Sequence, residues 1–345
     1  MSKKVYSLKK IYLSILVAIS LTLGLLITSS VEATETQEDE VGYSVQAYLP
    51  DNQRDTGVSY FDLLVEPEET YTLQVEIYNH KAQELVVDIT PTTASTNRNG
   101  LIVYEVQEDF DDSLKYPISE LVSIEETQVN VPANETKVVD ITLQIPNVPF
   151  EGVMLGGLEF KKVLDEDETS DGVQINNQYA YVIGLQATED EQADDQNLNL
   201  ASIKPNLVNY RTAVVARIQN DQPILMSKID IHAEVFEEGS DNLIKTADLE
   251  NAQFAPNSTM DFTIDWENEY LEPGDYRLKM VATDTENNEE WTWDEPFSIT
   301  EEESQISEDA VELEEDSWLT PTFFIIVIIV LLIIIGILYY KYKKK

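Results

Sequence analysis

The sequence from Thr70 to Ile89 is TYTLQVEIYNHKAQELVVDI, in which two stretches of alternating apolar and polar residues flank a short polar turn. In the first stretch, Leu73, Val75 and Ile77 occupy alternate positions. Because successive side chains of a β-strand point to opposite faces, this spacing predicts a strand with one buried face. The turn begins at Asn79, and the second apolar stretch follows it closely. The segment therefore predicts two successive strands joined by a turn.

A second segment, from Arg211 to Ile231, has the same organisation in the sequence RTAVVARIQNDQPILMSKIDI, with Asn220 at the start of its turn. Downstream of each segment, a turn containing Pro and Asn leads into another alternating stretch, VPANETKVVDI from Val131 and FAPNSTMDFTI from Phe254. Two interpretations of this echo are open: an internal repeat of one domain type, or the strand and turn composition common to all β-sandwiches. Both interpretations predict an all-β protein.

Strand-like alternation recurs along most of the chain, whereas helical periodicity is rare. The one helix-like segment outside the ends, Ser113 to Val122, contains Pro117, which would confine it to a short turn. Many short strands separated by Pro, Asn, Asp and Gly are typical of sandwiches, and the chain is too long for one sandwich of about 100 residues. We therefore predict two immunoglobulin-like β-sandwich domains in tandem, plus one C-terminal transmembrane helix.

Both ends of the chain carry uncharged apolar segments. A lysine-rich start, the apolar run Ile11 to Ile27 and small residues before Ala33 predict a secretory signal peptide, residues 1–33, cleaved after Ala33. An uncleaved membrane anchor is the alternative. Residues 321–340 are apolar enough to cross a bilayer as a helix, and the lysine-rich tail 341–345 places the C-terminus in the cytoplasm. The expected location is the cell membrane, crossed once, with the bulk of the chain outside.

Composition between the two ends predicts the domain boundaries. Residues 191–198 belong to an acidic segment that is typical of a linker. The first sandwich is then expected at 34–190 and the second at 199–300. Residues 301–320 are rich in Glu and Asp and poor in apolar side chains, so we expect a solvated acidic stalk there.

The charge balance is strongly acidic. The chain has 65 Asp and Glu against 22 Lys and Arg, with a formal net charge of −43. Such a charge repels nucleic acid, and we expect no nucleic-acid partner. The chain has no cysteine, so an exported form must be held together by its core alone. An exported, cysteine-free, membrane-anchored chain is also typical of a Gram-positive cell surface.

The glycine-rich stretch from Pro149 to Lys162, PFEGVMLGGLEFKK, raises the question of a phosphate-binding loop. Gly152 and Gly157 bracket four residues, but Leu158 stands where such a loop requires lysine. Apolar residues lie at both odd and even positions around Gly156 and Gly157. Because odd and even positions of a strand face opposite sides, this predicts a strand covered on both faces. We therefore interpret Gly152, Gly156 and Gly157 as structural positions that leave room for a large neighbour or a bulge.

No arrangement of catalytic or metal-binding residues stands out. The two histidines, His80 and His232, lie in different predicted domains, and no cysteine nucleophile exists. Carboxylates are so abundant that no particular pair is informative. We predict a protein that is not an enzyme and that has no cofactor and no metal ion. The alternative is a cell-wall-active hydrolase that uses a carboxylate pair in the first domain.

An ordered set of motifs resembles the WxL-interacting protein family, two-domain Gram-positive surface proteins with a C-terminal membrane anchor. The motifs are Ser59–Pro67, Tyr71–Asn79, Ser113–Val122, Val131–Thr136, Pro149–Phe160, Tyr179–Gly184, Phe254–Ser258 and Pro273–Tyr276. The resemblance implies a first domain that binds peptidoglycan and a second that binds host or extracellular matrix proteins. It also implies WxL-domain surface proteins as partners. The expected function is that of a membrane-anchored scaffold for cell-surface binding and adhesion.

Aromatic and polar residues of the predicted strands are the candidates for binding, because sugar rings stack on exposed aromatic side chains and hydrogen-bond with carboxylates and hydroxyls. Strand alternation favours burial of about half of these aromatics in the core. The glycan-binding candidates in the first domain are Tyr60, Asp62, Tyr104, Tyr116, Tyr179 and Tyr181. In the second domain, Trp291 and Trp293 share one face of a late strand, either as core residues or as anchors for a protein partner.

Overall fold

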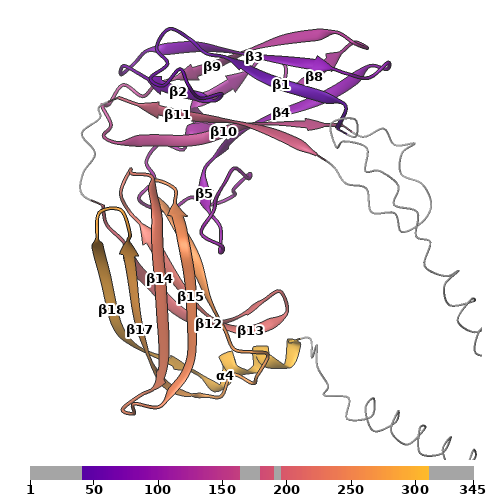
Figure 1. The fold of residues 1–345 in the computed structure, drawn as a ribbon. Coiled ribbons are helices and arrows are strands. Elements are labelled where there is room, and N and C mark those ends of the chain that lie inside the picture. The colour runs from indigo at the N-terminus through magenta and orange to yellow at the C-terminus, as the bar shows by residue number, and fades with distance from the viewer. Residues whose placement is uncertain (1–40, 164–178, 190–195, 311–345) are drawn as a thin grey trace, which may run out of the picture. The chain divides into compact units, whose positions relative to one another are not determined.

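The computed structural model describes residues 41–163, 179–189 and 196–310 (Figure 1). The predicted signal peptide, most of the predicted linker, the second half of the predicted stalk, the predicted transmembrane helix and the predicted cytoplasmic tail lie outside these residues. Among the described residues, no helix has the length and apolar character needed to span a membrane. The described chain is all-β and forms two immunoglobulin-like sandwiches, as predicted.

The first sandwich consists of a four-stranded sheet and a five-stranded sheet, labelled in the indigo to magenta part of Figure 1. All of the strand pairs are antiparallel except β2 with β11, which run parallel. The four-stranded sheet has the order β1 (Tyr43–Tyr48), β3 (Thr70–Asn79), β9 (Thr136–Gln144), β7 (Val122–Ile124). The five-stranded sheet has the order β2 (Phe61–Leu64), β11 (Ala180–Thr188), β10 (Val153–Lys162), β4 (Leu85–Thr93), β8 (Gln128–Val131).

The second sandwich consists of a three-stranded and a four-stranded sheet, and all of its strand pairs are antiparallel. The three-stranded sheet has the order β12 (Asn199–Val208), β13 (Arg211–Asn220), β16 (Ser258–Asp265). The four-stranded sheet has the order β15 (Leu243–Phe254), β14 (Met226–Glu237), β17 (Gly274–Asp284), β18 (Glu289–Ile299). Apolar residues at alternate positions of both sheets, such as Ile231, Phe262 and Leu278, form its core.

Short elements complete the described chain. A two-stranded hairpin, β5 (Ser95–Thr96) with β6 (Ile102–Val103), follows β4. The predicted short turn within Ser113 to Val122 is α3 (Ile118–Leu121), which begins directly after Pro117. The chain continues past β18 as α4 (Glu301–Ser304) and the 3-10 helix η2 (Gln305–Asp309).

The echo between the two halves of the sequence is an internal repeat. Asn79 donates from Nδ2 to the carbonyl of Gln83 at 2.8 Å, and Asn220 donates to the carbonyl of Ile224, also four residues on, at 2.7 Å. Both asparagines are fully buried, so these bonds satisfy their amide groups beneath a turn whose own residues are exposed or partly exposed. The same residue therefore closes the same turn in each sandwich.

The repeat extends to the turns before β9 and β16. Asn134 and Asn257 both have a left-handed backbone, with φ of 54° and 48°. Their N–H groups donate to the equivalent carbonyls of Lys81 and Gln222, both at 3.0 Å. Asn tolerates this backbone better than most residues, which explains its presence at both turns.

Strand order and register follow the repeat as well. The order β1-β3-β9 corresponds to β12-β13-β16, and β8-β4-β10-β11 corresponds to β15-β14-β17-β18. Ile77 pairs with Lys137 in the first sandwich, and the equivalent Ile218 pairs with Met260 in the second. The first sandwich adds β7 beside β9 and β2 beside β11, and these additions have no counterpart among the described strands of the second.

Two of the predicted boundaries differ from the structure. Leu198, placed in the linker, is 3% exposed and belongs to the core of the second sandwich, because it directly precedes β12, which pairs with β13. Residues 301–310, placed in the solvated stalk, fold back as α4 and η2. Ile306 packs on the second core, and Ser307 accepts the N–H of Leu271 at 3.1 Å. A single isoleucine and a capping box around Thr300 order this acidic segment.

The glycine-rich stretch forms β10, a central strand that is covered on both faces, as predicted. A Cβ on Gly156 would lie 2.3 Å from Cγ2 of Ile118, and one on Gly157 would lie 3.1 Å from the ring of Tyr104. These two side chains are the large neighbours. The alternative of a bulge is wrong, because the pairing of β10 with β11 and with β4 is continuous through both glycines.

The β5–β6 hairpin contacts the second sandwich. The hydroxyl of Thr96 lies 2.8 Å from that of Ser258 and accepts the N–H of Ala255 at 2.9 Å. The carbonyl of Gly100 accepts the N–H of Gln253 at 2.7 Å. Thr96, Ser258 and Ala255 are buried at this contact. The hairpin is therefore a connecting element whose turn lies against β15.

Candidate functional site

The outer face of the five-stranded sheet carries two of the candidate tyrosines above a pair of glycines. Gly157 of β10 and Gly184 of β11 are direct cross-strand partners. A Cβ on Gly184 would lie 3.6 Å from Cγ of Tyr60, and one on Gly157 would lie 3.2 Å from Cγ of Tyr104. The glycine pair therefore forms a shallow floor on which the two side chains lie.

Tyr60 and Tyr104 differ in exposure. Tyr60 is 40% exposed, whereas Tyr104 is half-buried and also packs on a small apolar cluster of Ala94, Leu155 and Ala255. Burial, and to a smaller extent the nearby phenol of Tyr60, raises the pKa of Tyr104. Its hydroxyl therefore stays protonated at neutral pH and can both donate and accept a hydrogen bond.

A polar network borders the tyrosines on the edge strand β2. Asp62 is 7% exposed and accepts hydrogen bonds on Oδ1 from Gln186 at 3.1 Å and from Arg54 at 3.3 Å. Arg54 also donates to the hydroxyl of Thr188 at 3.3 Å. Because Gln186 and Asp62 are adjacent partners in the parallel pairing, their side chains point to the same face as Gly184. We call the surface formed by Tyr60, Tyr104, Asp62, Gln186 and the exposed Val182 the tyrosine face.

The other tyrosine candidates lie elsewhere. Tyr181 contacts Tyr43 edge to face, with ring centroids 5.1 Å apart, and the hydroxyl of Tyr43 donates to the carbonyls of Phe160 and Tyr179 at 2.8 and 3.3 Å. Tyr181 has the opposite parity to Gly184 on β11, so it lies on the other face of the sheet. Tyr179 and Tyr181 are thus not part of the tyrosine face.

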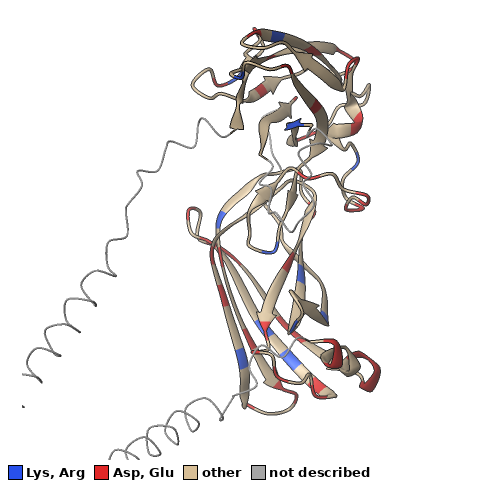
Figure 2. Cartoon of the chain, turned by 90° about the vertical axis from the view of Figure 1, so that its right-hand side faces the viewer, with Lys and Arg blue, Asp and Glu red and all other residues tan. Residues whose placement is uncertain are grey.

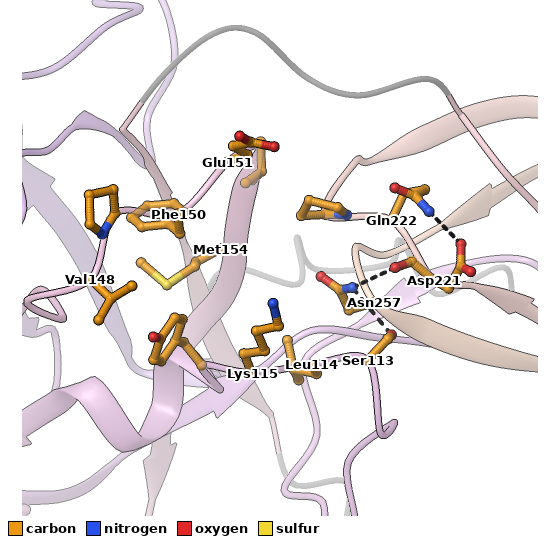
Figure 3. Close-up of a pocket in the computed structure, with 14 residues that line it drawn as sticks. Ser113, Leu114, Lys115, Val148, Phe150, Glu151, Met154, Asp221, Gln222 and Asn257 are labelled. Atoms are coloured by element: carbon orange, nitrogen blue, oxygen red, sulfur yellow. Dashed lines mark hydrogen bonds between the residues drawn. The ribbon is translucent and has the colours of Figure 1, made fainter.

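Tyr116 lines a cavity of about 570 Å³ between residues of the two sandwiches (Figure 3). Phe150 and Met154 lie on one side of it with Lys115, whereas Asp221 and Asn257 lie on the other. Asn257 donates from Nδ2 to the carbonyl of Asp221 at 2.9 Å and to the hydroxyl of Ser113 at 3.2 Å. Gly152 borders this junction with φ of 71°, and a Cβ on it would lie 2.1 Å from the carbonyl of Pro223. This backbone conformation and close approach favour glycine at this position.

Trp291 and Trp293 lie on the core-facing side of the edge strand β18. Both are partly buried and pack on the core of the second sandwich. Their cross-strand partners are Ala282 and Met280, two buried core residues. Of the two interpretations of these tryptophans, packing accounts for the observed contacts.

Sequence reasoning missed the residues that complete the tyrosine face. Gly184 and Gln186 were not singled out, because their relation to Gly157 and Asp62 depends on the pairing of three strands that are distant in sequence. The available signal was the alternation Val182, Gly184, Gln186, which places one small residue between two larger ones on one face. Arg54 carried no signal, since it lies in the irregular segment before β2.

Charges on the described chain are spread out rather than clustered. Figure 2 shows acidic residues along both sandwiches, with basic residues between them. Several basic residues are paired across strands, such as Arg217 with Asp261 at 2.7 Å. Within the described ranges, no group of three or more potential ligands is arranged to hold a metal ion.

Each of the two sandwich regions matches the model of a known domain family. Residues 43–162 match the peptidoglycan binding domain of WxL Interacting Protein, and residues 170–307 match the host binding domain of WxL Interacting Protein. The chain belongs to the WxL-interacting protein family. The two matches bear out the two-domain layout, and they support a binding role at the cell surface for this WxL-interacting protein. None of the curated proteins matches the chain.

Several solved structures show a distant likeness to this WxL-interacting protein. The class 5 fimbriae chaperone CfaA is 14% identical, with 73% of this chain and 99% of that chain covered and a TM-score of 0.30. The CsuC–CsuE chaperone–tip adhesion subunit complex of Acinetobacter baumannii is 12% identical, with 65% and 90% covered and a TM-score of 0.31. The CupB2 chaperone of Pseudomonas aeruginosa is 14% identical, with 67% and 95% covered and a TM-score of 0.27. TM-scores of this size do not establish a common architecture for the whole chain.

Proposed function

We propose that this WxL-interacting protein is a membrane-anchored scaffold without catalytic activity. Its first sandwich binds peptidoglycan through the tyrosine face, and its second sandwich binds host or extracellular matrix proteins. The C-terminal apolar segment 321–340 holds the chain in the membrane of a Gram-positive cell, and WxL-domain surface proteins dock on the part outside. Support comes from the two family matches and from the composition of the chain ends.

The observation that carries the glycan-binding part is the placement of Tyr60 and Tyr104 on the Gly157–Gly184 floor beside Asp62 and Gln186. An exposed aromatic side chain offers an apolar surface to the C–H groups of a sugar ring. Phenol, carboxylate and amide groups around it match the hydroxyl and acetamido groups of a peptidoglycan strand. Because the network with Arg54 holds Asp62 and Gln186 in place, little side-chain entropy is lost on binding.

The test is co-sedimentation of the full-length chain, solubilised in detergent, with insoluble peptidoglycan. Tyr60→Ala removes the most exposed ring of the tyrosine face, and we expect the affinity to fall at least about tenfold, as for an interface anchor worth about 1.4 kcal/mol or more. Tyr210→Ala is the matched control, because Tyr210 is 69% exposed on the turn between β12 and β13 of the second sandwich. The control should bind as the unmodified chain does.

Equal affinities for the unmodified chain and for Tyr60→Ala would reject the tyrosine face as the glycan site.

The proposed membrane anchor is tested separately by extraction of cell membranes. A chain that ends before residue 321 should be found in the medium, whereas the full-length chain should stay with the membrane. Release of both chains would contradict the proposed anchor.

A further inference from the structure

The strand β16 presents a regular backbone edge on the side away from β13. Trp266 donates its N–H to the carbonyl of Thr212 at 3.0 Å, and hydrogen bonds to one neighbour alternate along an antiparallel strand. Even-numbered residues of β16 therefore bond to β13. The odd-numbered residues Thr259, Asp261, Thr263 and Asp265 direct their N–H and C=O groups outward, where no described strand pairs with them.

The other three edges of the second sandwich carry features that prevent strand addition. Pro205 lies within β12 and Pro296 lies within β18, and proline cannot donate to a ladder. The strand β15 pairs with β14 through three register irregularities, which distort its edge. The strand β16 has no Pro, no Gly and an unbroken register with β13. It is therefore the one edge of this sandwich, among the described strands, that lacks such protection.

In the first sandwich, a short strand occupies the edge that corresponds to the free edge of β16. Its equivalent strand, β9, is covered by the short antiparallel strand β7, in which Ser123 pairs with Thr142. Thr142 follows Asn134 by the same number of residues as Asp265 follows Asn257, so Asp265 occupies the equivalent place on β16. In β7, Val122 and Ile124 are half-buried on either side of the exposed Ser123. The edge thus accommodates apolar residues at alternate positions.

The β5–β6 hairpin lies near the start of the free edge. It contacts the first residue of β16, Ser258. Farther along, Thr259, Asp261 and Thr263 are partly exposed and line a cavity of about 360 Å³ with hairpin residues 96–98, residues 206–208 of β12 and Val215 of β13. Because its lining spans all three strands, this cavity lies over the face of the sheet. The hairpin therefore contacts the start of β16 and does not pair with it, since β5 and β6 form a separate two-stranded sheet.

We propose that the free edge of β16 binds an extended segment of a partner protein as an added antiparallel strand. The segment carries β-branched apolar residues at alternate positions, as β7 does, together with basic residues. Basic residues are expected because the chain has a net charge of −43, and this charge also opposes pairing with a second copy. The inference deepens the proposed function, since it names the edge through which a protein partner docks, but it does not involve the tyrosine face.

The experiment uses the full-length chain in detergent and a peptide with the Val-Ser-Ile sequence of β7 between lysines. We expect bound peptide to slow amide hydrogen exchange about tenfold or more at Thr259, Asp261, Thr263 and Asp265, with the even-numbered amides unchanged. Thr263→Pro removes one outward N–H and should weaken binding about tenfold or more. Thr263→Ala is the matched control, which loses the same side chain but keeps the N–H, and should bind within about twofold.

A second peptide, methylated on its central amide nitrogens, tests the same bonds without changing the protein, and it should bind at least about tenfold more weakly. Absence of protection at β16, protection at another edge, or equal binding of Thr263→Pro and Thr263→Ala would overturn the inference. Peptide binding should be unchanged in Tyr60→Ala. A failure of strand addition is therefore distinguishable from a failure of glycan binding.

Discussion

Gly157 lies in the middle of β10, beneath the ring of Tyr104 and beside Val182 of the neighbouring strand. A Cβ at this position would lie 2.8 Å from Cγ1 of Val182 and 3.1 Å from Cδ1 of Tyr104. Real Cβ atoms rarely approach other heavy atoms so closely, so a larger side chain must displace Val182 and shift the tyrosine ring. The residue thus contributes to stability and to the shape of the tyrosine face at once.

Gly157→Val is expected to lower the free energy of unfolding by about 1 to 3 kcal/mol, the usual cost of overpacking a filled site. Chemical denaturation of the purified chain measures this change. Gly184→Ala is the control, because a Cβ there has only ordinary contacts with Tyr60, the nearest at 3.5 Å. Equal stability of Gly157→Val and the unmodified chain would show that the close approach of Tyr104 is not required.

Because Tyr43 is buried, we expect the folded chain to lose stability at alkaline pH. Burial, with a smaller contribution from Tyr181, raises the pKa of Tyr43 to about 12, whereas an unfolded tyrosine ionises near pH 10. Between these values the unfolded chain loses the proton first, so about 2 to 3 kcal/mol of stability present below pH 10 is lost as the pH rises toward 12.

Tyr43→Phe cannot ionise and should remove this part of the pH dependence. At neutral pH the variant loses the hydrogen bond to the carbonyl of Phe160 and should be less stable by about 1 kcal/mol. Thermal unfolding from pH 8 to 12 should then show the stability difference from the unmodified chain shrinking above pH 10 and reversing as the pH approaches 12. Parallel curves over this range would contradict the assignment.

At the residue scale, the sequence allowed the strand faces and the closing asparagines to be predicted, because both depend on local periodicity and turn chemistry. Asn79 and Asn220 could be matched by their positions in the two alternating segments alone. The grouping of Tyr60 with Tyr104 could not be predicted, since it depends on which strands become neighbours. The burial of Leu198 was missed for a related reason, because a single apolar residue in an acidic segment carries no periodic signal.

The β5–β6 hairpin contacts the second sandwich, and the apolar–polar alternation of the sequence does not predict this element. Its strands have two residues each, too few to show a period. Its turn nevertheless lies against β15, with Gly100 at φ of 67°. A Cβ on Gly100 would lie 2.6 Å from Cβ of Ala252. Contact with a distant strand, rather than local propensity, thus accounts for the hairpin's position.

Gly100→Ala is expected to destabilise the contact between hairpin and β15 by about 1 to 3 kcal/mol, through both backbone strain and the clash with Ala252. Exchange of the buried amides of Ala255 and Gln253, which bond to the hairpin, should become faster. Gly239→Ala is the matched control. Gly239 has a similar φ of 75°, but a Cβ there would have no neighbour within 4 Å, so this substitution reports the backbone strain alone. Equal effects of the two substitutions would argue against the hairpin contact.

On the scale of the whole molecule, the fold was accessible from the sequence, because two copies of one strand and turn pattern fill most of the chain. The end of the second sandwich was placed too early, since α4 and η2 are acidic and short, and Ile306 is the one apolar side chain of theirs that packs on the core. The two strands that the first sandwich adds, β2 and β7, distinguish its edges from those of the second. The tyrosine face depends on β2. The open edge of β16 depends on the absence of a strand equivalent to β7 among the described strands of the second sandwich.

A scaffold that only binds the wall and a wall hydrolase would behave differently when mixed with purified cell walls. Purified cell walls are incubated with the full-length chain, and bound protein and wall turbidity are followed together. For a scaffold we expect saturable binding that Tyr60→Ala weakens, with turbidity constant for the unmodified chain. A steady loss of turbidity, abolished by changing a single carboxylate to its amide, would contradict the claim that this protein binds the wall without cleaving it.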